Sequence, residues 1–167
     1  MSYQIDQSGK VEVTQKKSAI SYSNSDYGTV ILNPKDKRII QKSLRLAGLS
    51  RVYVYQIFSI CLFKLIYTFK LKGAILVDTE YPGKNDLIKN YVIQMLSYVN
   101  WEEKISLTFG FVGKKSSAHK TAIKYYRIYR SPFSARVYNM KINDVVNELV
   151  KINPKNKTPE ILRAFKS

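Results

Sequence analysis

Alternating and continuous runs of apolar residues predict five strands. Ser2 to Asp6 alternates, as a strand with one buried face does, and Ser18 to Ser23 and Tyr27 to Asn33 are two further strand-like runs. Three polar residues separate the second run from the third, which predicts an antiparallel hairpin and, with the first run, a three-strand meander. Ala74 to Val77 is continuously apolar, which predicts a strand buried on both faces, and Ile105 to Val112 alternates again.

Helical periodicity fills the intervals between these strands. Asn33 followed by Pro34 predicts a capped helix that ends at Gly48. The clearest amphipathic pattern predicts a helix over Lys84 to Val99, with all its apolar residues on one face. A further helix is expected over Ser117 to Tyr129, directly after a basic turn.

One segment, Val52 to Phe69, is almost entirely apolar. Its 18 residues approach the length of a membrane-spanning helix, and that interpretation stays open as an alternative. Lys64, near the centre of the segment, would be costly in lipid. A helix buried against a sheet is therefore the favoured interpretation, and stable membrane insertion is not expected.

The carboxyl-terminal part has weaker periodicity. We expect two short helices there, one capped by Asn143 or Asp144 and one that begins at Thr158, with a flexible linker at Asn153 to Lys157. The whole order of elements predicts an α/β fold in which helices cover a mixed five-strand sheet. We expect this fold over residues 1–130, followed by a small helical extension over residues 131–167.

Charge is the strongest signal in the composition. The chain has 28 Lys and Arg against 12 Asp and Glu, which gives a formal charge of +16 and a pI near 9.8. Such an excess favours a polyanionic partner, most commonly nucleic acid, over a surface made basic for solubility; an anionic membrane surface stays open. One cysteine and a polar amino terminus without a signal sequence predict a reducing, cytoplasmic location. A homodimer is compatible with these features.

Two acids follow the continuous apolar strand. Asp78 and Glu80 are two residues apart, so an extended chain places them on the same side, at the end of the strand where α/β sheets bind ligands. Carboxylates there suit a hard divalent cation such as Mg²⁺ or Mn²⁺. The alternative is a strand that leaves the core into two solvated acids.

Two further residues are candidates for the same chemistry. Asp6 ends the first strand, where it is either a metal ligand or the partner of Ser8 or Gly9 in an Asx-turn. His119, the single histidine, could orient water or accept a proton. A lone histidine more often contacts a phosphate or lies half-buried. The sequence contains no Cys/His cluster for zinc, no Gly-rich nucleotide loop and no Ser/His/Asp set.

A compact basic segment precedes and enters the predicted helix that carries His119. Free N–H groups at a helix start attract phosphate, so we expect a nucleic-acid contact there, formed by Lys114, Lys115, Ser116, Lys120 and Arg127. The tyrosines of this helix could stack on unpaired bases or pack into the core; they are Tyr125, Tyr126 and Tyr129.

The element order and three short segments resemble the ribonuclease H-like fold shared by ribonuclease H, Holliday-junction resolvases and many transposases. The segments are YQIDQSGK with Asp6, ILVDTEYPG with Asp78 and Glu80, and GKKSSAHKTA with His119. They also resemble a family of short prokaryotic proteins with IDQSGK, DTEYPG and GKKS-AH blocks, a likeness that implies no activity by itself. The resemblance covers about residues 3–129. It implies a catalytic set of Asp6, Asp78, Glu80 and His119, in which the three acids hold two metal ions.

The chain departs from that pattern at two places. The superfamily often has an acid on its first long helix, whereas Pro34 to Lys72 contains only Asp36. Either Glu80 substitutes for that acid or the second metal site is weaker. The last helix offers His119 in place of a carboxylate. We therefore expect a divalent-metal-dependent nuclease or resolvase, with a non-catalytic nucleic-acid-binding protein on the same fold as the alternative.

Overall fold

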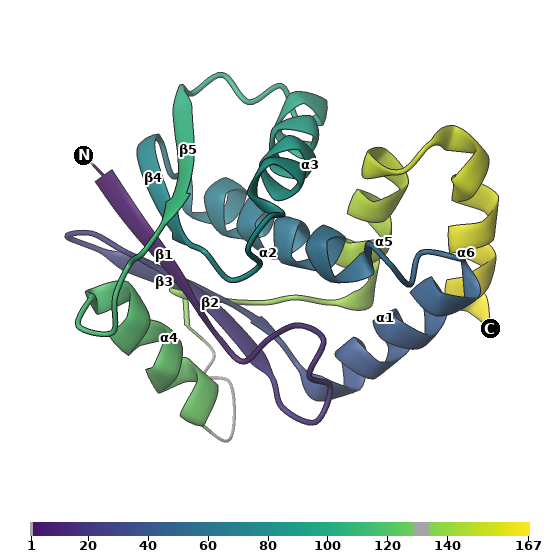
Figure 1. The fold of residues 1–167 in the computed structure, drawn as a ribbon, viewed down its shortest axis with the longest axis horizontal. Helices are drawn as coiled ribbons and strands as arrows, with labels where there is room; N and C mark the ends of the chain where they lie inside the picture. Colours follow the sequence, from purple (N-terminus) through teal and green to yellow (C-terminus); the bar gives the residue numbers. More distant parts are fainter. Residues whose placement is uncertain (1, 129–133) are drawn as a thin grey trace.

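The computed structural model describes residues 2–128 and 134–167, which form one mixed sheet with helices on both sides (Figure 1). The sheet order is β5-β4-β1-β2-β3-β6; β2 is antiparallel to both its neighbours, and the other neighbouring pairs are parallel. The strands are β1 (Ser2–Ser8), β2 (Ser18–Ser23), β3 (Tyr27–Leu32), β4 (Gly73–Asp78), β5 (Ile105–Gly110) and β6 (Val137–Asn139).

The α/β class and the three-strand meander are confirmed, but the expected count of five strands is wrong. The sixth strand, β6, pairs in parallel with the outer edge of β3, where Thr29 lies opposite Val137. Three residues are too few to show the alternation that reveals a strand in a sequence. Only the edge of β3 makes this segment a strand.

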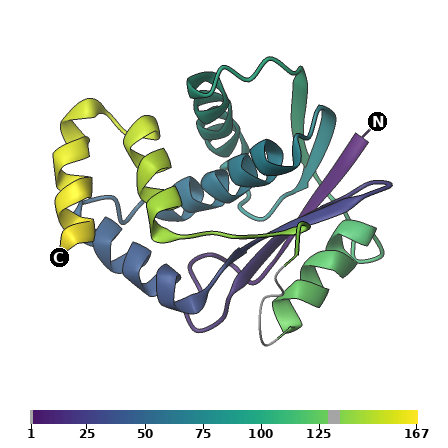
Figure 2. The ribbon, with the colours of Figure 1, turned by 180° about the vertical axis from the view of Figure 1, so that it is seen from behind.

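The helices divide unequally between the two faces of the sheet. Figures 1 and 2 show α4 on one face, over β1 and β2, and α2 lying across the other face with the remaining helices around it. The helices are α1 (Pro34–Leu46), α2 (Tyr53–Phe69), α3 (Asn85–Tyr98), α4 (Ser117–Arg127), α5 (Ile142–Ile152) and α6 (Thr158–Lys166). Tyr129, the expected last residue of α4, lies outside the described residues.

Helix α2 is the centre of the core, as the buried-helix interpretation predicts. Its apolar residues are buried nearly all round because the sheet covers one side and α3 and α5 pack against others; Phe58 and Phe63 are each 1% exposed. Lys64, its one charged residue, lies 3.6 Å from Glu148 of α5. In the described part of the chain, no helix combines the length and apolarity that crossing a bilayer requires.

Burial of β4 on both faces, which its continuous apolar run predicts, is wrong. Ile75 and Val77 are buried against the α2 and α3 side, but Ala74 is exposed and Leu76 is half-buried. The cause is the position of α4, which packs on β1, β2 and β3. The side of β4 that carries its alternate residues therefore borders open surface.

Local side-chain hydrogen bonds mark the starts of α1 and α5. Asn33 caps α1 as expected, since its Oδ1 accepts the backbone N–H of Asp36 at 2.9 Å. The expected cap of α5 by Asn143 or Asp144 is wrong. Lys141 occupies the cap position, and Asp144 lies three residues further on, where its carboxylate accepts the Lys141 N–H at 2.9 Å.

The carboxyl-terminal residues join the same core as the rest of the chain. Val145, Leu149 and Ile161 are fully buried in it. The segment expected as a flexible linker instead contains a short 3₁₀ helix (Lys155–Lys157), preceded by buried Asn153, which hydrogen-bonds Gln56 of α2. The expected boundary at residue 130 lies outside the described residues, so the division into 1–130 and 131–167 stays a prediction.

A buried lysine fixes the long loop between β1 and β2. Lys37 of α1 is 2% exposed, and its Nζ donates to three backbone oxygens of the loop, those of Lys10, Val13 and Lys16, at 2.9, 2.9 and 2.7 Å. Burial lowers the pKa of Lys37 to about 8. Three acceptors compensate the desolvated ammonium group, so this contact holds the loop against α1.

We expect Lys37→Met to lower the free energy of unfolding by about 2–4 kcal/mol, because three buried carbonyl groups lose a charged donor. Chemical denaturation measures this change. Lys35→Met is the matched control, since Lys35 is exposed on the same helix and should change stability by at most about 0.5 kcal/mol. Equal effects of the two substitutions would show that the loop does not depend on Lys37.

Candidate metal centre

Three carboxylates meet at the carboxyl ends of two neighbouring strands. β1 and β4 are parallel, with Ile5 opposite Val77, so the next residues, Asp6 and Asp78, come side by side. Glu80 follows two residues later. One oxygen from each of the three side chains lies within 4.8 Å of the others. The structure thus brings together all three acids predicted from the sequence.

Backbone hydrogen bonds orient the two aspartates. Asp6 is 5% exposed, and its Oδ1 accepts the N–H of Gln7 at 2.7 Å, in place of the Asx-turn contact with Ser8 or Gly9. Asp78 Oδ1 accepts the N–H of Val112, just beyond β5, at 2.8 Å. Each carboxylate keeps further lone pairs for a ligand, since an ionised carboxylate has about four acceptor sites.

Helix α4 carries His119, whose side chain lies beside the same acids. Ser116 caps the helix, because its Oγ accepts the backbone N–H of His119 at 3.0 Å. The His119 ring is half-buried, and its Nδ1 lies 2.5 Å from Asp6 Oδ2. Asp6 therefore fixes the orientation of the ring, an arrangement in which the second ring nitrogen, Nε2, is the one directed to other partners.

The three acids repel one another, so their simultaneous ionisation is unfavourable. Burial, followed by the charges of Asp6 and Asp78, raises the pKa of Glu80 to about 7, and Lys10 only partly offsets this. Burial also raises the pKa of Asp6, against the lowering effect of its hydrogen bonds to His119 and Gln7. Full ionisation of the cluster is thus unfavourable without a cation. A hard divalent ion would relieve the repulsion and fits the all-oxygen donor set.

The three acids and His119 line a small pocket of about 170 Å³, whose other lining residues are Gln7, Phe111, Gly113 and Lys114. Gln7 is 7% exposed, and among the described residues its Oε1 has no hydrogen-bond partner. Phe111 is 87% exposed. Neither residue was predicted as part of the site from the sequence. Only the position of Gln7 directly after Asp6 could have indicated the first.

Of the basic residues predicted to bind nucleic acid, only Lys114 lines this pocket. The side chains of Lys115, Lys120 and Arg127 are exposed. The Ser116 hydroxyl is engaged in the helix cap.

The two tyrosines of α4 that the structure describes pack in or against the core, as one of the two interpretations predicts. Tyr125 is 5% exposed in a small cluster with Ala19 and Ile31, and Tyr126 packs against that cluster. Stacking on bases is therefore not available to Tyr125. Tyr129 and the neighbouring Arg130 lie outside the described residues.

Comparisons with known proteins add no assignment: no protein-family model, no curated protein and no solved structure matches this chain.

We expect Glu80→Gln to stabilise the metal-free protein at pH 8. The folded state holds the Glu80 proton more tightly than the unfolded state does, because the folded pKa is about 7 against an ordinary value of 4.5. Wild type should therefore lose stability as pH rises from 4.5 through 7, relative to the variant. Denaturation in EDTA should show equal stability near pH 4 and a gain on the order of 1–3 kcal/mol for the variant at pH 8.

Glu160→Gln, an exposed glutamate on α6, is the matched control and should change stability by at most about 0.5 kcal/mol at either pH. If Glu80→Gln left the pH dependence unchanged, Glu80 would not carry the repulsion described above.

Proposed function

We propose that this protein is a divalent-metal-dependent nuclease or resolvase that cleaves phosphodiester bonds of nucleic acid. The observation that carries the proposal is the convergence of Asp6, Asp78 and Glu80, with one oxygen of each within 4.8 Å of the others. Acids clustered at the ends of parallel strands, with the pKa values of Asp6 and Glu80 raised, are unfavourable for the fold itself. They are what binding of a hard cation requires.

Asp6, Asp78 and Glu80 would hold Mg²⁺ or Mn²⁺. Such ions, when bound, activate water and stabilise the leaving oxygen of a phosphodiester. The side chains around the acids supply the remaining functions. His119, oriented by Asp6, is placed to position a water molecule or accept its proton. Lys114, at the edge of the pocket, is placed to contact a phosphate next to the acids.

The strand arrangement supports a ribonuclease H-like fold. Five strands in the order β5-β4-β1-β2-β3, with β2 reversed, agree with the meander and two further strands that the resemblance implies, and β6 is an addition outside β3. The acid of the first long helix is absent here. Asp36 lies in the first turn of α1 and hydrogen-bonds Asn33, far along the sequence from the cluster. Glu80 takes the third acidic place instead.

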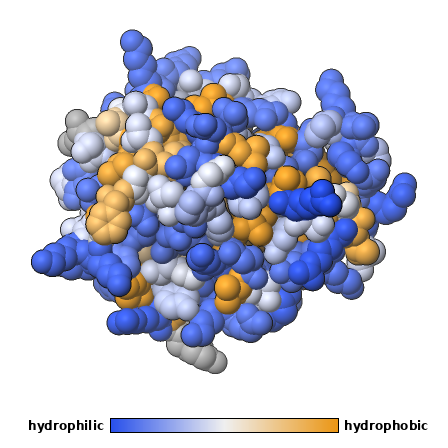
Figure 3. Space-filling view, in the orientation of Figure 1, coloured by the Kyte–Doolittle hydropathy of each residue, from blue (hydrophilic) through white to orange (hydrophobic). Residues whose placement is uncertain are grey.

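The charge of the protein supports nucleic acid as the substrate. A formal charge of +16 favours a polyanion, and Lys114, Lys115 and Lys120 lie at or just before the start of α4, with Lys114 lining the acid pocket. The face in Figure 3 is hydrophilic over most of its area, with smaller apolar patches between the polar side chains.

One observation favours the non-catalytic alternative, a nucleic-acid-binding protein on the same fold. His119 lies 2.5 Å from Asp6 Oδ2, so this contact competes with a metal for that oxygen. Metal-dependent cleavage separates the two functions, because the alternative requires binding without hydrolysis.

We expect Asp78→Asn to abolish Mn²⁺- or Mg²⁺-dependent cleavage and leave nucleic-acid binding intact or tighter, since the substitution keeps the shape but removes a negative charge that repels phosphate. Asp6→Asn should behave likewise, and the double variant should be little worse than either single one. The assay compares branched, duplex, hybrid and single-stranded substrates. Asp86→Asn, an exposed acid on α3, is the matched control and should cleave like wild type.

Cleavage that survives Asp78→Asn would place the active site elsewhere. Wild-type protein that binds nucleic acid but cleaves none of the substrates would establish the non-catalytic alternative.

We also expect affinity for duplex DNA to fall steeply with salt, by about 0.9 log units per phosphate neutralised for each log unit of salt concentration. The double substitution of Lys114 and Lys115 by Ala should weaken binding and reduce that slope by about two units. The matched control replaces Lys155 and Lys166, two exposed lysines near the carboxyl terminus, and should leave the slope closer to wild type. Salt-independent binding would exclude a phosphate-driven interface.

A further inference from the structure

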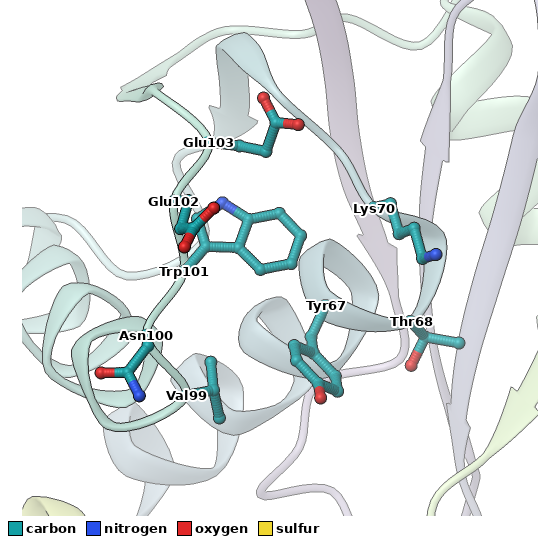
Figure 4. Close-up of a pocket in the computed structure, with 8 residues that line it drawn as sticks. All are labelled: Tyr67, Thr68, Lys70, Val99, Asn100, Trp101, Glu102 and Glu103. Carbon is teal, nitrogen blue, oxygen red and sulfur yellow. The ribbon is translucent and has the colours of Figure 1, made fainter.

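A second pocket lies apart from the acid cluster, where the carboxyl end of α2 approaches the segment that follows α3. It encloses about 610 Å³. Figure 4 shows the side chains that line it, which come from the last turn of α2 and from the connection between α3 and β5. They are Tyr67, Thr68, Lys70, Val99, Asn100, Trp101, Glu102 and Glu103.

Two aromatic rings form the apolar part of this pocket. The ring centroids of Tyr67 and Trp101 are 6.0 Å apart and tilted by 54°. Phe63 supports Tyr67 from within α2, at 5.6 Å and nearly parallel. Tyr67 nevertheless remains 46% exposed. Aromatic faces held in this way attract cations through the negative charge on the ring face.

Acidic groups and helix ends around the rings also favour a cation. Glu102 and Glu103 are the only adjacent pair of acids in a sequence with 28 basic residues. Both are exposed. The carboxyl ends of α2 and α3 also reach this pocket, and each helix end carries partial negative charge.

Two lysines oppose this field. Lys70 lines the pocket, and Lys72 lies 3.7 Å from Glu103. The side chains of that ion pair are 64% and 53% exposed, so solvent weakens it and another cation can replace Lys72.

We propose that this pocket binds an organic cation whose charge is spread over an apolar or planar group, such as a methylated ammonium or a guanidinium. The rings of Tyr67 and Trp101 contact the body of the cation, and Glu102 and Glu103 balance its charge. A bare metal ion does not fit the site, because hard cations require oxygen ligands on several sides and aromatic faces provide none. This inference is independent of the proposed nuclease activity.

The sole tryptophan of the chain, Trp101, makes the test specific to this pocket. Tetramethylammonium chloride and methylguanidinium chloride are titrated while Trp101 fluorescence is recorded at constant ionic strength. We expect saturable changes with a dissociation constant on the order of 1–100 mM. Sodium chloride controls for salt, and tert-butanol controls for a neutral group of similar shape; neither should give a saturable change.

Two variants separate the charge from the rings. The double substitution Glu102→Gln and Glu103→Gln should weaken binding of both probes by about 3- to 10-fold, and Tyr67→Leu should weaken it by a similar factor. Glu160→Gln, an exposed glutamate on α6, should bind like wild type. A fluorescence response equal to that of sodium chloride or tert-butanol would overturn the proposal. So would binding that is unchanged in both pocket variants.

Discussion

The parallel pairing of β1 with β4 is the constraint on which the candidate site depends. The register that places Ile5 opposite Val77 is fixed because both side chains are buried in the core. A shift by one residue would turn the apolar side chains of one strand out of the core and its aspartate into it. Hydrophobic burial on one face of the sheet thus determines which carboxylates meet on the other face.

The cluster that results is held together against its own electrostatics. Hydrogen bonds from Gln7 and Val112 and the contact with His119 orient the aspartates, while burial and mutual repulsion raise the pKa of Glu80 to about 7. The surrounding fold supplies the stability that this arrangement lacks, through the large core around α2. Acids kept in such a state by packing elsewhere are typical of functional sites.

The β1–β2 loop also contacts the segment that carries Glu80. Lys37 holds three of its carbonyl groups, and Glu12 of the same loop accepts a hydrogen bond from the Tyr81 hydroxyl at 2.9 Å. Tyr81 directly follows Glu80. The buried lysine on α1 is therefore connected, through one loop, to the backbone that positions the third acid.

Much of the fold could be predicted because its signals are local. Alternation marks β1 and β5, strand-like runs mark β2 and β3, and Asn33 marks the start of α1 through its own side-chain hydrogen bond. Convergence of Asp6 and Asp78 was also predictable, since both lie near the carboxyl ends of strands of one sheet, although β1 continues past Asp6 to Ser8 instead of ending there. What escaped prediction depends on distant contacts.

The three residues of β6 become a strand only beside β3. The exposed side of β4 follows from where α4 packs. The three carbonyl groups that accept hydrogen bonds from Lys37 precede it by 21 to 27 positions in the sequence. The pocket at Trp101 likewise requires two helix ends to meet. No local sequence pattern specifies such tertiary contacts, because each is set by the packing of whole elements.

Anomalous X-ray diffraction from crystals soaked in Mn²⁺ tests whether the three acids bind a metal ion, since it locates the metal without reference to any activity. We expect an anomalous peak between the carboxylates of Asp6, Asp78 and Glu80, within coordination distance of all three. Crystals that bind Mn²⁺ only elsewhere, or that show no peak at millimolar Mn²⁺ and neutral pH, would contradict it.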